Sequence, residues 1–546
     1  MGEGGAARAG ARGAAAAPGC AVDRRAFGRG EGDHAVSTAA APAQPAGLPA
    51  SPLVITAVVM LGSFMTILDS TIANVALPHM QPSLNAAADS VTWVLTSYIV
   101  ATAVATPLTG WLAARIGRRS LFLWSVAGFT ITSVMCGLAG SLTEMVIWRM
   151  LQGAAGAFLA PLGQAYVLDV WPPAKHGPAM AWWGVGVMVG PILGPVVGGW
   201  LTDSFDWRWV FLINLPFGLI CFAWATAVLP EPALPQRRFD LIGFAMLALG
   251  MAALQLALDR GQQLDWLESW EVRIEFGLAI AGLWAFGVHA LATPGAIVDR
   301  QLLTDRNAMT GMLFITMVGF LLVATTALLP TMVQTMFGYP VVAAGELMMP
   351  RGIGMMIAMM SAGQLLGRGV DPRLMLGVGF TLTGAALWGM SLFSPQQDAW
   401  PFMSTGFVQG LGLGLIFVPL NTVAFASLPM ALRTDASAIF MLLRNIGGSI
   451  GISVAVALLE RQTQVSHADL GSGITPFSQP WADPAALAAA GLGGVVAVLD
   501  GTVSKQAVMI AYIDVFRAMS VMALAMLLLL PILKRPKPAP PVHLPE

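Results

Sequence analysis

The stretch 54–76 reads VITAVVMLGSFMTILDSTIANVA and carries one ionisable side chain, Asp69. A run of about 20 apolar residues is long enough to cross the hydrocarbon core of a bilayer as a helix. A charged side chain inside such a helix costs about 2.5 kcal/mol or more on insertion scales, so it is retained chiefly where it has a function. The stretch therefore predicts a membrane-spanning helix with Asp69 as a candidate functional residue.

The whole chain shares this composition. Of its 546 residues, 56% are hydrophobic and only 10% are charged, whereas a soluble domain carries about 25% charged residues. So few charges cannot cover a water-facing surface, and the lipid bilayer is the expected surroundings. The net charge of −1 lacks the positive excess of a nucleic-acid-binding protein, so no nucleic-acid partner is expected.

Apolar runs recur along the chain and predict an all-α membrane protein with fourteen transmembrane helices. They lie near 54–76, 92–113, 120–140, 143–167, 179–201, 209–229, 241–258, 273–292, 308–331, 343–364, 373–393, 402–425, 436–459 and 508–530. With both termini inside, the inner segments hold 19 of the 28 Lys and Arg residues, and the outer segments hold Arg208, Arg260, Arg273, Arg461 and Lys505. Cytoplasmic loops carry the excess of Lys and Arg, so we expect a multi-pass protein of the bacterial inner membrane with cytoplasmic termini.

Three segments lie outside these spans. Residues 1–50 are rich in Ala, Gly, Pro and Arg and predict a disordered tail, because no apolar stretch of about 7–15 residues follows the arginines as in a signal peptide. Residues 531–546 are predicted to form a cytoplasmic tail. Residues 461–507 form the largest predicted periplasmic segment, which either lies on the membrane surface or docks a partner.

Pairs of residues recur at a slowly drifting offset and indicate an internal repeat. The pairs are Leu77-Pro78 with Leu329-Pro330, Gly110 and Arg115 with Gly363 and Arg368, Gln152-Gly153 with Gln409-Gly410, Pro161-Leu162 with Pro419-Leu420, and Gly190 and Gly194 with Gly447 and Gly451. The first of these pairs predicts the ends of the first and ninth spans. The repeat predicts an N-terminal six-helix bundle at 54–230, two extra helices at 241–292 and a C-terminal six-helix bundle at 308–530. Parallel six-helix repeats are the layout of the major facilitator fold.

One predicted span carries small residues at every fourth position. Gly186, Gly190, Gly194 and Gly198 would line one helix face and let another backbone approach closely. Pro191 and Pro195 remove hydrogen-bond donors and favour a bend. Such a helix is either a pivot or seal in a moving protein or simply a tightly packed element.

Asp69 has a candidate partner in Arg149. The two residues lie at similar depth in spans that run in opposite directions, so they can form a proton-coupling pair or a purely structural ion pair. In the second half of the repeat the matching positions are Leu321 and Gly406. The proton chemistry is therefore expected in the first half alone.

Three further charged residues are candidates for contact with a substrate or cation. Glu346, near the outer end of the tenth span, can recognise cations or carry protons, or it can be an interfacial anchor. Arg351 lies about one turn deeper. Arg444 precedes the Gly447 stripe, where it can line the cytoplasmic mouth or be structural.

Several strings resemble the major facilitator superfamily. GWLAARIGRR at 110–119 looks like its cytoplasmic loop motif, with Gly110, Arg115, Gly117 and Arg118 in place. RMLQGAAG at 149–156 resembles its fourth-span motif, and GPILGPVVGG at 190–199 resembles the fifth-span motif of its exporters. The loop motif normally has an acid where this chain has Ala114, so its arginines can serve as inside anchors alone.

Other strings resemble one group within that superfamily. LDSTIANVALP at 68–78 and WRWVFLINLP at 207–216 are similar to the fourteen-helix drug:proton antiporters of the EmrB/QacA type, and residues 258–266 resemble the EmrB branch. The resemblance implies that the spans of Asp69 and Arg149 line a cavity and that a proton gradient replaces any cofactor. It also implies a periplasmic adaptor (EmrA-like) and an outer-membrane channel (TolC-like) as partners.

We therefore expect a proton-coupled multidrug efflux transporter that exports small hydrophobic or amphipathic toxic compounds by alternating access. The alternatives are a dedicated exporter of one endogenous metabolite, such as a siderophore or antibiotic, and a non-transporting membrane sensor. No catalytic or metal-binding residues are expected, because no His/Cys/Asp cluster or nucleophile motif stands out in the sequence. The protein is thus not expected to be an enzyme.

Overall fold

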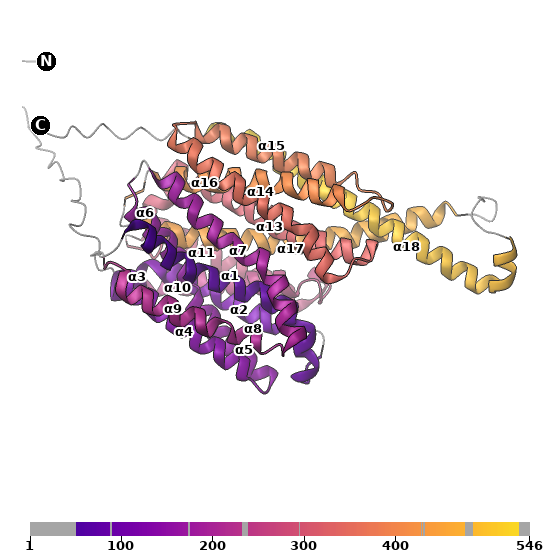
Figure 1. Ribbon diagram of the computed structural model, residues 1–546, viewed down its shortest axis with the longest axis horizontal. Helices are drawn as coiled ribbons and strands as arrows, with labels where there is room; N and C mark the ends of the chain where they lie inside the picture. The colour runs from indigo at the N-terminus through magenta and orange to yellow at the C-terminus, as the bar shows by residue number, and fades with distance from the viewer. Residues whose placement is uncertain are drawn as a thin grey trace, which may run out of the picture. The chain divides into compact units, whose positions relative to one another are not determined.

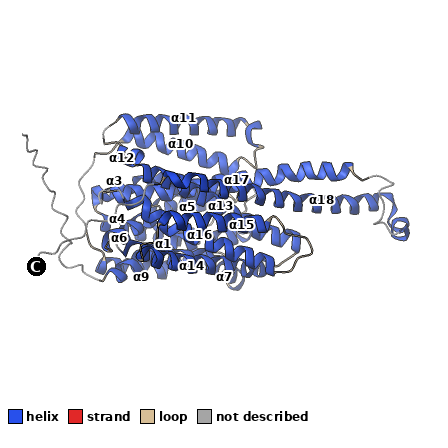
Figure 2. Cartoon of the chain, turned by 90° about the horizontal axis from the view of Figure 1, so that it is seen from above, coloured by secondary structure: helices blue, strands red, loops and turns tan. Residues whose placement is uncertain are grey.

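The computed structural model describes residues 51–87, 90–172, 175–231, 238–293, 295–426, 428–429, 432–474 and 484–533. These residues are mostly helical and contain no strand (Figure 2). The helices are α1 (Pro52–Ser83), α2 (Trp93–Ala105), η1 (Thr106–Leu108), α3 (Thr109–Ile116), α4 (Arg118–Leu138), α5 (Leu142–Gly156), α6 (Leu159–Val170), α7 (His176–Ser204), α8 (Trp209–Leu212), α9 (Asn214–Val228), α10 (Leu241–Arg260), η3 (Trp266–Glu268), α11 (Trp270–Ala292), α12 (Arg300–Thr304), α13 (Arg306–Phe337), α14 (Val341–Gly367), α15 (Pro372–Met390), α16 (Trp400–Ala426), α17 (Arg433–Ser472), α18 (Pro484–Ala525) and η5 (Met526–Ile532). The predicted tails, 1–50 and all but the first residues of 531–546, lie outside the described residues.

A helix occupies each of the fourteen predicted spans. Within the described ranges, twelve helical runs are long and apolar enough to cross a membrane. The other two, α14 and α15, have 27 and 19 residues and stand at the tenth and eleventh predicted positions. Large apolar side chains such as Trp124, Trp284 and Leu528 are more than two-thirds exposed, as expected for a lipid-facing surface.

Two helices continue past the predicted ends of their spans. The sequence predicts that the first span ends at Leu77-Pro78 and the ninth at Leu329-Pro330, yet Pro78 and Pro330 lie inside α1 and α13. A proline removes one backbone donor and strains the preceding turn. Packing against neighbouring helices is enough to continue both helices, and each reaches 32 residues.

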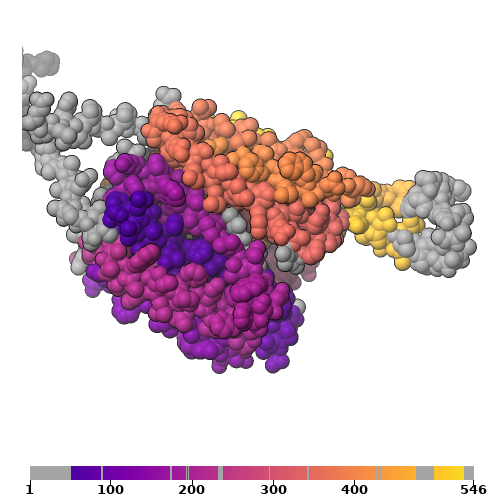
Figure 3. Space-filling model, in the orientation of Figure 1, coloured from indigo at the N-terminus to yellow at the C-terminus, as the bar shows by residue number. Residues whose placement is uncertain are grey.

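The same helix pairs recur in the two halves of the chain, as the repeat predicts. In the first half α1 packs on α7, α2 on α5, and α4 on α9; in the second half α13 packs on α17, α14 on α16, and α15 on α18. Figure 1 shows these two sets in indigo to magenta and in orange to yellow, and the space-filling view shows them as adjoining blocks (Figure 3). The halves meet where α7 packs on α14 and where α3 and α6 pack on α17.

The extra helices α10 and α11 pack on each other, and α10 also contacts α2 and α17. The 258–266 string fixes this contact. Thr96 donates a hydrogen bond to Asp259, and Ser453 Oγ donates to the Leu258 carbonyl at 2.7 Å. The string therefore joins the extra pair to both halves.

The predicted segment 461–507 differs from expectation. Helix α17 continues to Ser472, and α18 begins at Pro484 and runs to Ala525. The two pack side by side and extend past the ends of neighbouring helices (Figures 1 and 2). In its described part, the segment is thus a continuation of two spans and not a stretch lying on the membrane surface. Its small Ala and Gly residues are compatible with a helix, although they make a weak hydropathy signal.

Candidate functional site

Asp69 lies inside α1 and is 1% exposed. Its position on α1 is set by α7, whose glycine stripe faces the same stretch of that helix. A Cβ on Gly190 would lie 3.3 Å from the Leu68 backbone nitrogen, and one on Gly194 would lie 2.2 Å from Thr71 Oγ1. The absence of side chains on this face of α7 thus allows α1 to lie directly against it.

The Asp69 carboxylate accepts three hydrogen bonds. Arg149 Nη1 donates to Oδ2 at 2.6 Å, while Gln152 Nε2 and Asn214 Nδ2 donate to Oδ1 at 2.9 and 2.8 Å. Arg149 and Gln152 are three residues apart on α5 and share a helix face. All three donor residues are fully buried, so helices α1, α5 and α9 meet at one water-excluded ion pair.

Further contacts fix the two ends of this network. Arg149 Nε donates to the Val94 carbonyl of α2 at 3.0 Å, and its guanidinium lies 4.3 Å from the centre of the Tyr98 ring. Such a cation–π contact adds to the stability of a desolvated cation. On α4, Ser133 Oγ accepts a hydrogen bond from Asn214 at 2.9 Å and donates to the Phe211 carbonyl at 2.9 Å.

The contacts of the site set the negative charge of Asp69 against the positive charge of Arg149. While Asp69 is ionised, Arg149 and two amide groups compensate its charge. A proton on Asp69 removes that charge and leaves a buried cation unpaired, and breaking a buried pair in this way costs about 3–5 kcal/mol. Arg149 Nη2 and Asn214 Oδ1 are already buried without a partner among the described residues.

The sequence predicts the pairing of Asp69 with Arg149 but not the other members of the network. Gln152 stands out in the sequence only as part of the fourth-span motif and the internal repeat, Asn214 only as part of 207–216, and Ser133 not at all. Each is an uncharged polar residue in an apolar span, and this is the signal that could have identified them.

The other charged candidates lie in the second half and do not join this network. Glu346 is exposed on α14. Arg351 is buried, and its Nη2 donates to the Leu322 carbonyl at 3.1 Å and to Thr325 Oγ1 at 2.9 Å. No ion pair joins Arg351 to an acid within the described part of the chain. Arg444 is half-buried, with Nη2 3.5 Å from Asn445 Oδ1.

The loop motif spans α3, its turn and the start of α4. Gly117 has φ of 87°, which glycine adopts without strain, and it turns the chain between the two helices. Arg115 is exposed, whereas Arg118 is fully buried and pairs with Asp169 of α6. Arg118 is therefore more than an interfacial anchor. Gly110 lies against α17, where a Cβ would overlap the carboxylate of Asp435.

Beside this loop a polar cluster joins the two halves. Asp169 also accepts a hydrogen bond from Arg433 Nη1, the first residue of α17, at 3.1 Å. Gln164 of α6 donates to Asn421 Oδ1 of α16 at 2.6 Å and accepts from Ser437 Oγ of α17 at 2.6 Å. These contacts, which we call the interhalf latch, close the bundle at the end that carries the loop motif.

The remaining fifth-span residues all lie within α7. Gly198 packs against Ile72 of α1, whereas a Cβ on Gly199 would meet no atom within 4 Å. Pro191 is half-buried, and the side chain of Pro195 lies outside the described residues. The stripe therefore contacts α1 through one face only.

Comparison with known proteins supports one family. The family model of the Major Facilitator Superfamily matches residues 59–452. The multidrug export protein EmrB of Escherichia coli strain K12 is 36% identical over 433 residues, which cover 78% of this chain and 84% of the relative. The fatty acid resistance protein FarB of Neisseria gonorrhoeae is 36% identical over 490 residues, which cover 88% and 95%.

Solved structures agree on the fold. A human organic anion transporter matches with a TM-score of 0.59 at 15% identity, over 88% of this chain and 99% of that chain. The proton:xylose symporter XylE matches with a TM-score of 0.58 at 14% identity, over 90% and 97%. Two equivalent sets of membrane helices, the first of which holds a buried ion pair, are typical of a polytopic transport protein. This chain belongs to the major facilitator superfamily, in its EmrB/QacA-type group.

Proposed function

We propose that the protein is a proton-coupled exporter of small hydrophobic or amphipathic toxic compounds. The observation that carries the proposal is the buried ion pair of Asp69 and Arg149, 2.6 Å apart on α1 and α5. Antiport needs a group whose protonation changes the relative stability of two helix arrangements. The pair supports this role because a proton on Asp69 would leave the buried Arg149 without its counter-charge. The name of EmrB, a multidrug export protein, supports the substrate class, and the proton gradient supplies the energy without a cofactor.

In an alternating-access cycle one end of the bundle must close while the other opens, and the interhalf latch is the proposed closing contact. It closes the end of the bundle that carries the loop motif, which the distribution of Lys and Arg assigns to the cytoplasm. When Asp69 takes up a proton, Arg149 loses its partner and α5 is freed from α1. Because α6 follows α5 directly and carries Asp169 and Gln164, this rearrangement is coupled to the latch.

Arg351 is the proposed contact for acidic groups of substrates. It is a buried cation, 8% exposed, whose described hydrogen-bond acceptors are one carbonyl and one hydroxyl. A carboxylate from an amphipathic acid would complete its charge balance. The name of the relative FarB, a fatty acid resistance protein, is in keeping with such substrates.

Arg351→Gln should therefore reduce export of anionic amphiphiles several-fold more than export of cationic ones. The measurement is export of a matched anionic and cationic dye from cells with equal amounts of each variant. Arg368→Gln, which changes an exposed arginine at the end of α14, serves as control. Equal losses for both dyes would assign Arg351 a structural role.

We further propose an inner-membrane position with both termini in the cytoplasm, and a periplasmic adaptor with an outer-membrane channel as partners. The extended α17–α18 pair supports this, because it lies on the side away from the latch and reaches past the other helices (Figure 2). A reporter fused after Ser472 should then be active in the periplasm. Cytoplasmic activity would reverse the orientation.

The experiment for the transport function is reconstitution in liposomes. With a pH gradient imposed, the wild-type protein should accumulate an amphipathic compound, and a protonophore should abolish the accumulation. Addition of the compound should also release protons in the opposite direction. Binding without accumulation under any gradient would favour the sensor, and accumulation of one metabolite alone would favour the dedicated exporter.

A further inference from the structure

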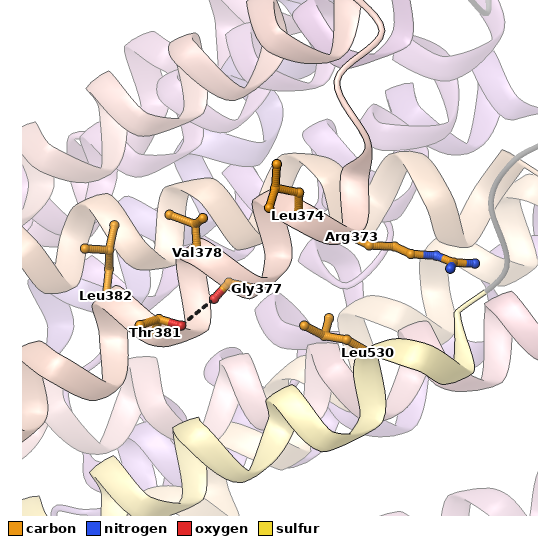
Figure 4. Close-up of a pocket in the computed structure, with 7 residues that line it drawn as sticks. All are labelled: Arg373, Leu374, Gly377, Val378, Thr381, Leu382 and Leu530. Atoms are coloured by element: carbon orange, nitrogen blue, oxygen red, sulfur yellow. Dashed lines mark hydrogen bonds between the residues drawn. The ribbon is translucent and has the colours of Figure 1, made fainter.

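A groove unrelated to the ion pair lies on the outer surface of the second half, between α15 and η5 (Figure 4). Its volume is about 400 Å³, and it is lined by Arg373, Leu374, Gly377, Val378, Thr381, Leu382 and Leu530. The groove exists because Gly377 has no side chain, since a Cβ there would lie 3.3 Å from Leu530 Cδ1. It belongs to no element of the proposed transport site.

The groove is apolar along its length. Leu374, Val378 and Leu382 recur every four residues, so they form a wall that follows the axis of α15 and hence runs across the bilayer. Thr381 Oγ1 donates to the carbonyl of Gly377 at 2.8 Å (Figure 4), which satisfies the hydroxyl within the helix. Leu374 and Val378 are 64% and 44% exposed, and such a surface fits an acyl chain.

One end of the groove carries a positive charge. Arg373 is the second residue of α15 and is half-buried, and its Nε is buried without an acceptor among the described residues. The neighbouring carboxylate, Asp371, caps the helix by accepting the Arg373 amide at 3.0 Å. Three more basic residues follow the helix that carries Leu530 in the sequence, namely Lys534, Arg535 and Lys537.

We propose that this groove binds an anionic phospholipid of the cytoplasmic leaflet. Its phosphate accepts a charge-assisted hydrogen bond from Arg373, and one acyl chain lies along Leu374, Val378 and Leu382. Basic pockets between membrane helices on the cytoplasmic side bind anionic lipid headgroups in this way. The assignment to that leaflet uses the proposed orientation, whereas the site itself depends only on the groove and its arginine.

The test is lipid binding to the full-length protein, measured by native mass spectrometry in detergent. Phosphatidylglycerol should occupy one site about tenfold more tightly than phosphatidylcholine with the same acyl chains. The phosphate of either lipid can accept from Arg373, but the choline cation offsets the attraction between the phosphatidylcholine headgroup and the arginine. Arg373→Gln should abolish the preference, and Arg368→Gln, which alters an exposed arginine outside the groove, should retain it. Equal binding of both lipids, or loss of the preference in Arg368→Gln alone, overturns the proposal.

Two further arms separate a lipid site from other sources of anion binding. Thr381→Trp fills the groove but keeps every positive charge, so it should lose the bound phosphatidylglycerol. Retention of the lipid by this variant would assign it to the basic residues after Leu533 and overturn the proposal. Inorganic phosphate at millimolar concentration should leave the bound lipid in place. Displacement by phosphate would mean that the groove binds a free anion and no acyl chain.

Discussion

A carboxylate that stays ionised inside a helix bundle needs several donors at once. Asp69 has a cation and two amides within 3 Å, and the donors are in turn fixed by α2 and α4. Hydrogen bonds to a charged group contribute about 1.5–3 kcal/mol each. The ion pair therefore depends also on residues that do not touch Asp69.

Ser133→Ala tests whether the site depends on residues that do not touch Asp69. The change leaves Asn214 Nδ2 and the Phe211 carbonyl each one partner short, so we expect a loss of about 1–3 kcal/mol in stability and a several-fold slower transport. Thr132→Val is the matched control, because the Thr132 hydroxyl bonds only carbonyls of its own helix. Thermal unfolding and uptake into liposomes measure both effects. If the two variants have equal stability and transport rates, Ser133 does not stabilise the network.

For single residues, the sequence predicts only the charged members of the Asp69 network. A charge in an apolar span is conspicuous, so Asp69 and Arg149 can be paired by depth alone. Gln152, Asn214 and Ser133 cannot be assigned, because a neutral polar side chain in a membrane helix often bonds its own backbone, as Thr132 does. Only the orientation of each helix decides between the two cases.

Among the elements, α7 determines how closely α1 packs at the site. Its glycine stripe contacts α1 on both sides of Asp69, at Met60, Ile67, Thr71 and Ile72. In the second half the stripe of α17 contacts α13 in the same manner, through Gly447 at Thr316 and Gly451 at Phe320. Both halves thus keep a close helix contact, although only the first half has the acid.

Gly194→Ala should disturb this contact strongly. The new Cβ would lie 2.2 Å from Thr71 Oγ1, whereas the same substitution at Gly199 meets no atom within 4 Å. Overpacking costs about 1–3 kcal/mol, so Gly194→Ala should lower the unfolding temperature and slow transport. Gly199→Ala should change neither. Unfolding in detergent and uptake assays compare the two, and a tolerated Gly194→Ala would mean that α1 and α7 separate easily.

The sequence predicts the elements well because apolar runs of fixed length have few alternatives in a membrane. It fails at their ends. Proline normally stops a helix, yet packing carries α1 past Pro78 and α13 past Pro330. The α17–α18 extension is not predicted, because residues 461–472 of α17 are mostly polar and the Ala and Gly residues of α18 weaken the hydropathy signal without breaking a helix.

For the whole molecule, the two halves have equivalent packing but different chemistry. Positions matching Asp69 and Arg149 are Leu321 and Gly406, while Gln409 keeps the place of Gln152 and donates to Thr325 at 3.1 Å. The sequence reveals this asymmetry through the repeat. It cannot reveal the interhalf latch. There Gln164 bonds Asn421 and Ser437, which lie on other helices more than 250 positions further along the chain.

Asp169→Asn should weaken the latch. It removes the shared counter-charge of Arg118 and Arg433, so the latched end should open more often. In a protein without its native cysteines, a cysteine at position 437 should then react several-fold faster with a maleimide, since Ser437 is fully buried. Asp206→Asn, in a partly exposed pair with Arg208, is the control. An unchanged rate would show that the latch does not hold that end closed.

Our central proposal is that Asp69 carries the transported proton, and one variant tests it most directly. Asp69→Asn keeps the shape of the side chain and removes its titration. In liposomes with an imposed pH gradient, we predict that this variant still binds substrate but does not accumulate it against its concentration gradient. Accumulation at the wild-type rate would contradict the proposal and make Glu346 the leading candidate for proton transfer.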